Sequence, residues 1–518
     1  MSSTSNDRLT KLPAEILREI IVQLETKSSI DLFFEAYPSI LSLYSSYERG
    51  ILEGILANLL ANDVEGNIRK DVLAIVEFSN PKGEFCLQFR KKGRTPRVKP
   101  EELQWPDWPQ SPETGYLQQV HRLLSRIIAF IEDYISKATS EYPPRAYLGL
   151  PDLKTGETSF MGSLLETRFL PFTSLRRSER YRLLRAFVRY ELLCEIHNTR
   201  DDRWDVPDEF QNFNALGTPN APDPKALLSV HEYYIGLYGA VFAHCSGDAW
   251  LPDLPSSLSA DAFGKATKGP SLKYRPLLFP DNLFFDAEGY YDDLYINGSR
   301  VAEELAGCGL DLLVRVLSCL EQPGSPRYIK HWVHGLTDEQ KYEFAPWIEE
   351  QYDPRHDKEY SAYRELIMSS RFSDELPKSE ERIKSMNEYL LSNGGTERWF
   401  PHWHEAHKLQ LRIYRQRAWG FFDDQRFYPN KTCHFPTLES LVDLQSEEKN
   451  SKATQEEPDE RGKRRSKHWQ DYLAGIRPDK PMLMAYPCRR GLRFFDDAVA
   501  PGDLPWIGGE YQHPDGWR

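Results

Sequence analysis

Apolar residues recur at intervals of three and four along most of the chain, a spacing that places side chains on one face of an α-helix. The clearest case is 116–137, where Leu117, Val120, Leu124 and Ile127 share a face. Residues 408–414 fit both an alternating strand and a helix, and we interpret them as a helix. The same spacing predicts further helices at 12–24, 39–60, 66–78, 176–197, 225–245, 300–320, 338–351, 359–370 and 379–391.

Strand signals are few, and the main one is the short run FCLQF at 85–89. No repeat with a period of 20 to 50 residues is present, which disfavours solenoids and propellers. The pattern therefore predicts a mainly α protein, with a small N-terminal helical unit, a larger irregular helical body and few short strands.

Stretches rich in proline or charge divide the chain into predicted domains. A first helical unit is expected at 8–60 and a helical body at 61–440, with a candidate break at 91–115, where five prolines lie among basic residues. Residues 445–467 carry no large apolar side chain, so we expect a disordered linker there. Residues 468–518 alternate short apolar pieces with Pro and Gly and are expected to form an irregular tail.

Composition narrows the class of protein. Aromatic residues make up 13% of the 518 positions, which is too rich for a chain that is disordered throughout. The net charge of −13 argues against nucleic acid and anionic membranes as partners of the whole surface. No apolar run approaches the ~20 residues of a membrane span, and the seven cysteines form no CxxC pair. We expect a protein of the cytoplasm, the nucleus or both.

The first sixty residues read as a compact group of three helices. Pro13 suits the first turn of a helix, where a missing N–H needs no partner. Thr26 to Ser29 interrupts the pattern, a short second helix follows, and Pro38 separates it from a longer third one. Three helices of this size bury little surface, so they are expected to pack on a partner or on the rest of the chain.

This stretch resembles an F-box. LPAEILREIIVQL matches the Leu-Pro-x-Glu-Ile/Leu opening of that family, and SSIDLFFEAYPSILSLYSSYERGIL is similar to a variant common in filamentous fungi, with Ala36 and Pro38 in the expected places. The Cys and Trp of the third helix in the best-known F-boxes are absent. A second segment, RQRAWGFFDDQRF at 415–427, looks like one that recurs near the C-terminus of fungal F-box-like proteins.

The resemblance implies an adaptor without chemistry of its own. In the family, the F-box docks on the Skp adaptor subunit of a Skp–cullin–F-box ubiquitin ligase, and the C-terminal region recruits a protein substrate. Joining the two on one scaffold raises their effective concentration. Carried over to this chain, the residues that contact the Skp adaptor would be Leu12, Pro13, Ile16, Leu17, Ile20, Leu24, Ile30 and Phe33.

Two other interpretations stay open. In the first, the chain is a helical interaction protein that keeps the F-box-like fold without the ligase, and 39–78 cover the apolar face. In the second, which ranks last, it is a metal enzyme that uses His402, His404 and His407 beside Glu405. That cluster falls one residue short of HExxH and has no cysteine pair at a zinc-binding spacing.

No catalytic, metal or cofactor residue is assigned, and we expect no enzyme. The chain lacks the GxxxxGK[ST], GxGxxG and GxSxG patterns of nucleotide and hydrolase sites. Cys433 and His434 are neighbours only in sequence. Paired acids, which in loops are usually solvated turn residues, occur at Asp201-Asp202, Asp292-Asp293, Asp423-Asp424 and Asp496-Asp497.

Two further segments carry alternatives. The basic run Lys463, Arg464, Arg465 and Lys467 reads equally as a nuclear localisation patch and as a charge-balanced linker behind the preceding acids. Aromatic residues crowd one stretch beside several arginines, and we expect most of them in the core and a few at a binding surface. They are Trp399, Trp403, Trp419, Phe421 and Phe422.

Overall fold

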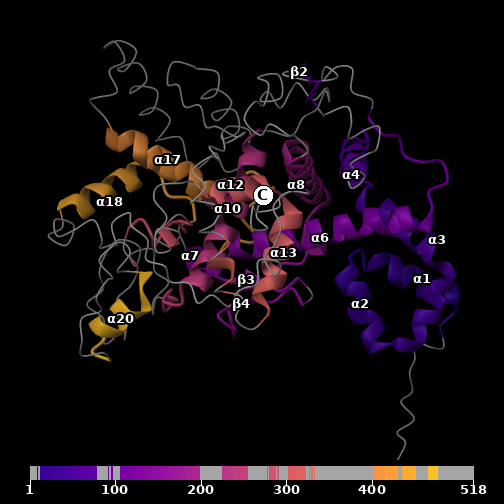
Figure 1. Cartoon of the computed structure of the whole chain (residues 1–518), viewed down its shortest axis with the longest axis horizontal. Helices are drawn as coiled ribbons and strands as arrows, with labels where there is room; N and C mark the ends of the chain where they lie inside the picture. The colour runs from indigo at the N-terminus through magenta and orange to yellow at the C-terminus, as the bar shows by residue number, and fades with distance from the viewer. Residues whose placement is uncertain are drawn as a thin grey trace, which may run out of the picture. The chain divides into compact units, whose positions relative to one another are not determined.

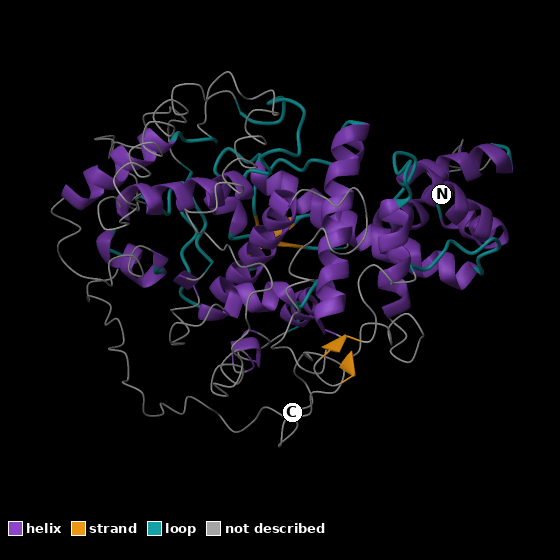
Figure 2. Cartoon of the chain, turned by 90° about the horizontal axis from the view of Figure 1, so that it is seen from above, coloured by secondary structure: helices purple, strands orange, loops and turns teal. Residues whose placement is uncertain are grey.

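The computed structural model describes most of the chain in separate ranges (Figure 1). These are residues 12–78, 105–153, 155–198, 224–254, 279–287, 301–322, 401–429, 434–450 and 465–476, with a few single positions and short strands between them. In this part the protein is mainly helical, as predicted, and its strands are short (Figure 2).

Most of the described helices match predicted ones. The long amphipathic stretch forms α6 over Thr114–Ala138, and 408–414 lies inside the longer helix α17 over Pro401–Gln416. The others are α1 (Ala14–Gln23), α2 (Lys27–Ala36), α3 (Leu41–Leu59), α4 (Asn67–Phe78), α7 (Pro143–Tyr147), α8 (Arg177–Asn198), α10 (Pro224–Ser246), α12 (Val301–Gly307), α13 (Leu310–Leu320), α18 (Leu438–Asn450) and α20 (Lys467–Leu473). Of these, α7, α18 and α20 were not predicted.

Some predicted elements differ or lie elsewhere. The helix expected at 300–320 is two helices, because Gly309 has a φ of 81° and interrupts the run between α12 and α13. The helices expected at 338–351, 359–370 and 379–391 and the strand at 85–89 lie outside the described residues. Short strands form instead at β1 (Lys91–Lys92), β2 (Thr95–Pro96), β3 (Leu150–Pro151), β4 (Thr158–Phe160) and β5 (Ser163–Leu164).

The chain forms two compact units. Unit 1 consists of Met1–Asp133, Pro151–Glu157 and Phe169–Leu227, and unit 2 of Tyr134–Leu150, Thr158–Arg168 and Leu228–Arg518. The helices α1 to α3 belong to unit 1 together with α4, α8 and most of α6.

A buried ion pair lies where α4 packs on α8 in unit 1. Arg189 Nε lies 2.9 Å from Asp71 Oδ2, and both side chains are almost wholly buried. Burial raises the pKa of Asp71 to about 6, although the nearby Arg189 and Arg185 act to lower it. A buried pair of this kind fixes how two helices meet more than it adds to stability.

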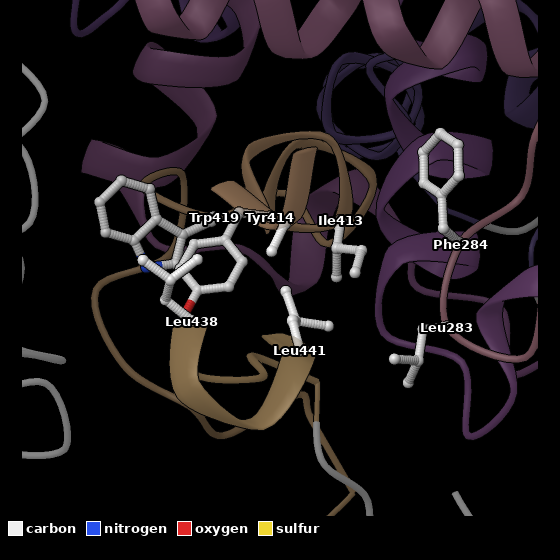
Figure 3. Close-up of a cluster of buried hydrophobic side chains, with 8 residues drawn as sticks. Leu283, Phe284, Ile413, Tyr414, Trp419, Leu438 and Leu441 are labelled. Atoms are coloured by element: carbon white, nitrogen blue, oxygen red, sulfur yellow. The ribbon is translucent and has the colours of Figure 1, made fainter. Parts of the chain in front are cut away.

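Unit 2 has an apolar core to which the end of α17, the helix α18 and the loop at 283–284 all contribute. Figure 3 shows the side chains of Ile413, Tyr414 and Trp419 gathered with Leu438 and Leu441, while Leu283 and Phe284 close the cluster from another segment. The segment 415–427, singled out for its resemblance, therefore lies in the core: its Trp419, Phe421 and Phe422 are buried, as expected for most of these aromatics. Trp399 and the side chain of Trp403 lie outside the described residues.

The C-terminal end of α17 is a Schellman motif without glycine. Ala418 has a φ of 51°, its N–H donates to Arg415 O at 3.1 Å, and the Trp419 N–H donates to Tyr414 O at 3.1 Å. These are the two bonds that define the motif, which usually carries glycine at the left-handed position.

Three tyrosine hydroxyls donate to the carbonyl groups at this helix end. Tyr134 reaches Arg415 O at 2.6 Å, and Tyr147 reaches Gln416 O at 2.9 Å. Tyr428 donates to the carbonyl of Arg417. Arg415 O also accepts from the Ala418 N–H, so the Tyr134 hydroxyl is its second donor. The last carbonyls of a helix lack partners within it, and the hydroxyls of Tyr147 and Tyr428 satisfy those of Gln416 and Arg417.

We expect Tyr147→Phe to lower the stability of unit 2 by ~1–3 kcal/mol, since the fully buried Gln416 carbonyl loses the donor that reaches it. Chemical denaturation followed by tryptophan fluorescence measures the change. Tyr47→Phe, which removes a hydroxyl from a half-exposed side chain, is the control and should change stability by less than ~0.5 kcal/mol.

A second prediction concerns acid stability. Burial lowers the pKa of His244 to about 4, although its hydrogen bond with Leu148 O (3.1 Å) acts to raise it. Between pH 6.5 and 4 the unfolded chain binds a proton there that the folded chain does not, so stability falls as the pH falls, by on the order of 3 kcal/mol. The pH dependence of thermal unfolding should be shallower in His244→Gln than in the unchanged chain, and identical slopes would contradict this assignment.

Candidate partner-binding surface

Local sequence explains the three short helices of unit 1. α1 begins after Pro13, with Glu15 in its first turn, where the helix dipole favours an acid. α2 is capped by Thr26, whose hydroxyl accepts a hydrogen bond from the Ser29 N–H at 3.2 Å. Pro38 ends α2 and starts the single turn Pro38–Ile40 that leads into α3. α1 packs along α3, and all three helices lie together at the indigo end of Figure 1.

The residues predicted to contact a Skp adaptor do not all face the same way. Leu17 and Ile30 are buried, at 6% and 3% exposure, and so belong to the core of the helices. Pro13 is exposed, and Ile16 is 49% exposed. The remaining four are half-buried, namely Leu12, Ile20, Leu24 and Phe33.

The structure adds exposed apolar residues that the sequence pattern did not single out. Leu32, Leu41 and Tyr47 are each about half exposed. Beside them in sequence lies a chain of half-buried rings, in which Phe34 meets Tyr44 edge-on with centroids 5.0 Å apart. Phe33 joins this chain through Phe34 and Tyr37. The signal for these residues was the unusually wide apolar stripe of IDLFF, which exceeds what one buried helix face needs.

The turn between α1 and α2 is held by polar groups of α6 and α8. Glu25 has a φ of 59°, and its carbonyl is 3.0 Å from His121 Nε2. Its carboxylate pairs with Arg180 Nη1 at 3.4 Å, and the Lys27 N–H donates to Ser125 Oγ at 3.0 Å. Burial raises the pKa of Glu25, which Arg180 acts to lower. A non-glycine residue keeps a left-handed conformation where such contacts over-determine it.

The other candidate sites lie largely outside the described side chains. In the described part of the chain, no group of three His, Cys, Asp or Glu residues could hold a metal ion. The histidine run lies on α17, and the side chains of His402, His404, Glu405 and His407 fall outside the described residues.

The remaining paired residues have structural partners where they are described. His434 is buried, with Nε2 2.9 Å from Ser140 O, and Cys433 is outside the described residues. Asp424 pairs with Arg426 at 2.8 Å, while the other acidic pairs lie in ranges that the structure does not describe.

Residues 445–467 differ from the predicted disordered linker at both ends. Gln445 to Asn450 continue α18, and Arg465 to Lys467 are ordered, while 451–464 lie outside the described residues. Arg465 is 3% exposed, so this residue of the basic run is buried. The irregular tail expected from 468 instead begins with the helix α20.

The chain was compared with models of protein families, with curated proteins and with solved structures, and none of the three comparisons gave a significant match. Among the described residues, no helix has the length and apolarity needed to cross a membrane.

The burial difference within α1 leads to a stability prediction. Leu17→Ala should destabilise unit 1 by ~2–4 kcal/mol because it leaves a cavity, whereas Ile16→Ala should cost less than ~1 kcal/mol. Denaturant titration of both variants measures the difference. Equal losses would mean that Ile16 is as deeply packed as Leu17 and does not face a partner.

Proposed function

We propose that the chain is an F-box-like adaptor that links a protein substrate to a Skp–cullin ubiquitin ligase. The observation that carries the proposal is the exposed side chain of Ile16, together with Pro13, in a Leu-Pro opening on the first of three short helices. Contiguous exposed apolar patches mark surfaces that partners cover, and on this proposal Ile16 and Pro13 belong to such a patch.

Under this proposal, some of the residues predicted to contact the Skp adaptor would touch it, and the others would support the fold of the helices. Pro13, Ile16 and the half-buried residues of the predicted set would touch the Skp adaptor, and the buried Leu17 and Ile30 would hold the helices in shape. The cullin would be reached through the adaptor, and no step of the proposal needs a catalytic group in this chain. The adaptor would act by holding the substrate close to the ligase, so that the two no longer have to meet by diffusion at low concentration.

A second candidate is an interaction protein that uses the same helices without the ligase. The observation that favours it is the Glu25 turn, which is bound into unit 1 by His121 and Arg180. Helices held in this way serve as a fixed part of a larger unit, and their exposed side chains could receive another partner.

Co-purification with the Skp adaptor separates the two. We expect Ile16→Asp to reduce binding at least tenfold, because a charge at the centre of an apolar contact must be desolvated. Val64→Asp is the matched control: Val64 is 93% exposed in the turn before α4, so the same change should leave binding as it was.

Circular dichroism and thermal unfolding of both variants show whether the fold survives. A folded, unchanged chain that fails to bind the Skp adaptor would refute the ligase proposal and leave the second candidate. Equal losses in Ile16→Asp and Val64→Asp would place the contact elsewhere.

A further inference from the structure

The C-terminal described segment, 465–476, packs on the rest of unit 2 with no fully buried apolar side chain. The residues of this segment that are buried are Arg465, Gln470 and Asp471, while Trp469 and Tyr472 stay partly exposed. A segment of a protein core normally buries apolar surface, which is the main favourable contribution to folding. Here the fully buried side chains of the segment are polar or charged, and the apolar side chains of Trp469, Tyr472 and Leu473 are only half-buried.

The guanidinium group of Arg465 occupies a site built for it. Nη2 lies 2.8 Å from Asp281 Oδ1 and 3.3 Å from Asp286 Oδ2, and the group sits over the Tyr290 ring at 5.2 Å from its centroid. Burial acts to lower the pKa of Arg465, but the two carboxylates raise it overall. Two carboxylates and an aromatic ring are the surroundings that suit a planar, permanently charged guanidinium.

Glycine leaves the space that this side chain fills. A Cβ atom placed on Gly289 would lie 1.2 Å from Arg465 Nη1, so any other residue at 289 would displace the guanidinium. Gly289 lies in a short helical segment and has no left-handed φ, so its backbone does not require glycine. Space for an arginine is the reason that the structure gives for glycine there.

The residues after Arg465 form hydrogen bonds with Asp248 and its neighbours. The Trp250 N–H donates to Arg465 O at 2.8 Å and the Lys467 N–H to Asp248 O at 2.7 Å, which makes a short antiparallel bridge between Ala249 and Ser466. The Asp248 carboxylate accepts hydrogen bonds from the Ser466 hydroxyl and from the backbone and ring of His468. Main-chain pairing with selected side-chain contacts is how extended peptides are recognised.

We propose that this acceptor site is a peptide-binding site for arginine-containing segments, and that 465–476 is its resident occupant, which an Arg-Ser segment of a partner protein displaces. The acceptor site is formed by Asp248, Ala249, Trp250, Asp281, Asp286, Gly289 and Tyr290. It lies wholly in unit 2 and does not depend on the N-terminal helices or on a ligase. The basic run at 463–467 is on this view a recognition element.

The first test uses the full chain with Arg465→Gln and a fluorescein-labelled peptide of residues 461–476. Fluorescence anisotropy should show binding at least tenfold tighter to this variant than to the unchanged chain, in which the tethered segment competes at an effective concentration near the millimolar range. Binding should weaken as salt rises. Equal affinities for the two chains, or no binding to the variant, would overturn the proposal.

Receptor-side variants locate the binding. Adding Gly289→Ala to Arg465→Gln should abolish peptide binding, because the methyl group takes the space of the guanidinium. Gly115→Ala is the matched control: Gly115 is also helical and has open space around it, so this change should leave binding unaltered. Full binding to the Gly289→Ala double variant would contradict the assigned site.

Two altered peptides test the chemistry. A peptide with Arg465→Gln should bind at least tenfold more weakly. A peptide phosphorylated on Ser466 should also bind weakly, because the hydroxyl that donates to Asp248 is replaced by a dianion facing a carboxylate. A phosphopeptide that binds as tightly as its parent would remove Asp248 from the recognition.

A further measurement uses the unchanged chain and so does not depend on whether a variant folds. Hydrogen exchange at 466–474 should speed up when an isotope-labelled copy of the peptide is added in large excess, because the tethered segment is displaced. The labelled peptide with Arg465→Gln should leave the exchange unchanged. Exchange that is unaffected by both peptides would show that 465–476 is a permanent part of unit 2.

Discussion

The buried carbonyl groups in the last turn of α17 are joined to separate segments of unit 2 by hydrogen bonds. Three tyrosine hydroxyls from separate segments donate to the carbonyls of 415, 416 and 417. The Gln416 side chain, with no exposed surface, pairs with the backbone of Phe285 through both its oxygen (3.0 Å) and its nitrogen (2.7 Å). An unpaired buried carbonyl costs ~1–3 kcal/mol, so α17 ends where it does only while these segments stay in place.

Unit 1 relies on the same kind of constraint at a smaller scale. The α1–α2 turn needs a left-handed residue, and Glu25 supplies it although glycine would be less strained. The carboxylate of Glu25 gives a reason for the exception, since it reaches Arg180 while the carbonyl meets His121. Polar contacts thus tie the turn between α1 and α2 to α6 and α8 within unit 1.

Periodicity predicted most of the described helices, because spacing of apolar residues and helix geometry are directly linked, and α6 is the plainest example. It missed α7, α18 and α20. It did not predict the break at Gly309, where a glycine with a positive φ separates α12 from α13 within one helical apolar spacing. Nor could periodicity predict that Leu17 is buried and Ile16 exposed. Both lie on the apolar side of α1, and the packing of α3 decides which of the two is covered. The burial of Arg465 was even less evident from the sequence. Its partners Asp281 and Asp286 lie about 180 residues away in the sequence, and the composition around Arg465 is that of a solvated run of charges.

The two candidate surfaces differ in the force that would hold a partner. On α1 to α3, the proposed contact residues, such as the exposed Ile16, are apolar, so association through them would gain from burial of surface and would be little affected by salt. At the acceptor site the contacts are ion pairs and hydrogen bonds, whose contribution depends on how well water is excluded. Arg465 meets that condition because it is almost completely buried, whereas His468 remains half exposed. Exchange of one arginine segment for another keeps the same bonds in both states, so little free energy separates the resident occupant from a competitor of the same sequence. Tether length and local concentration then decide which one is bound.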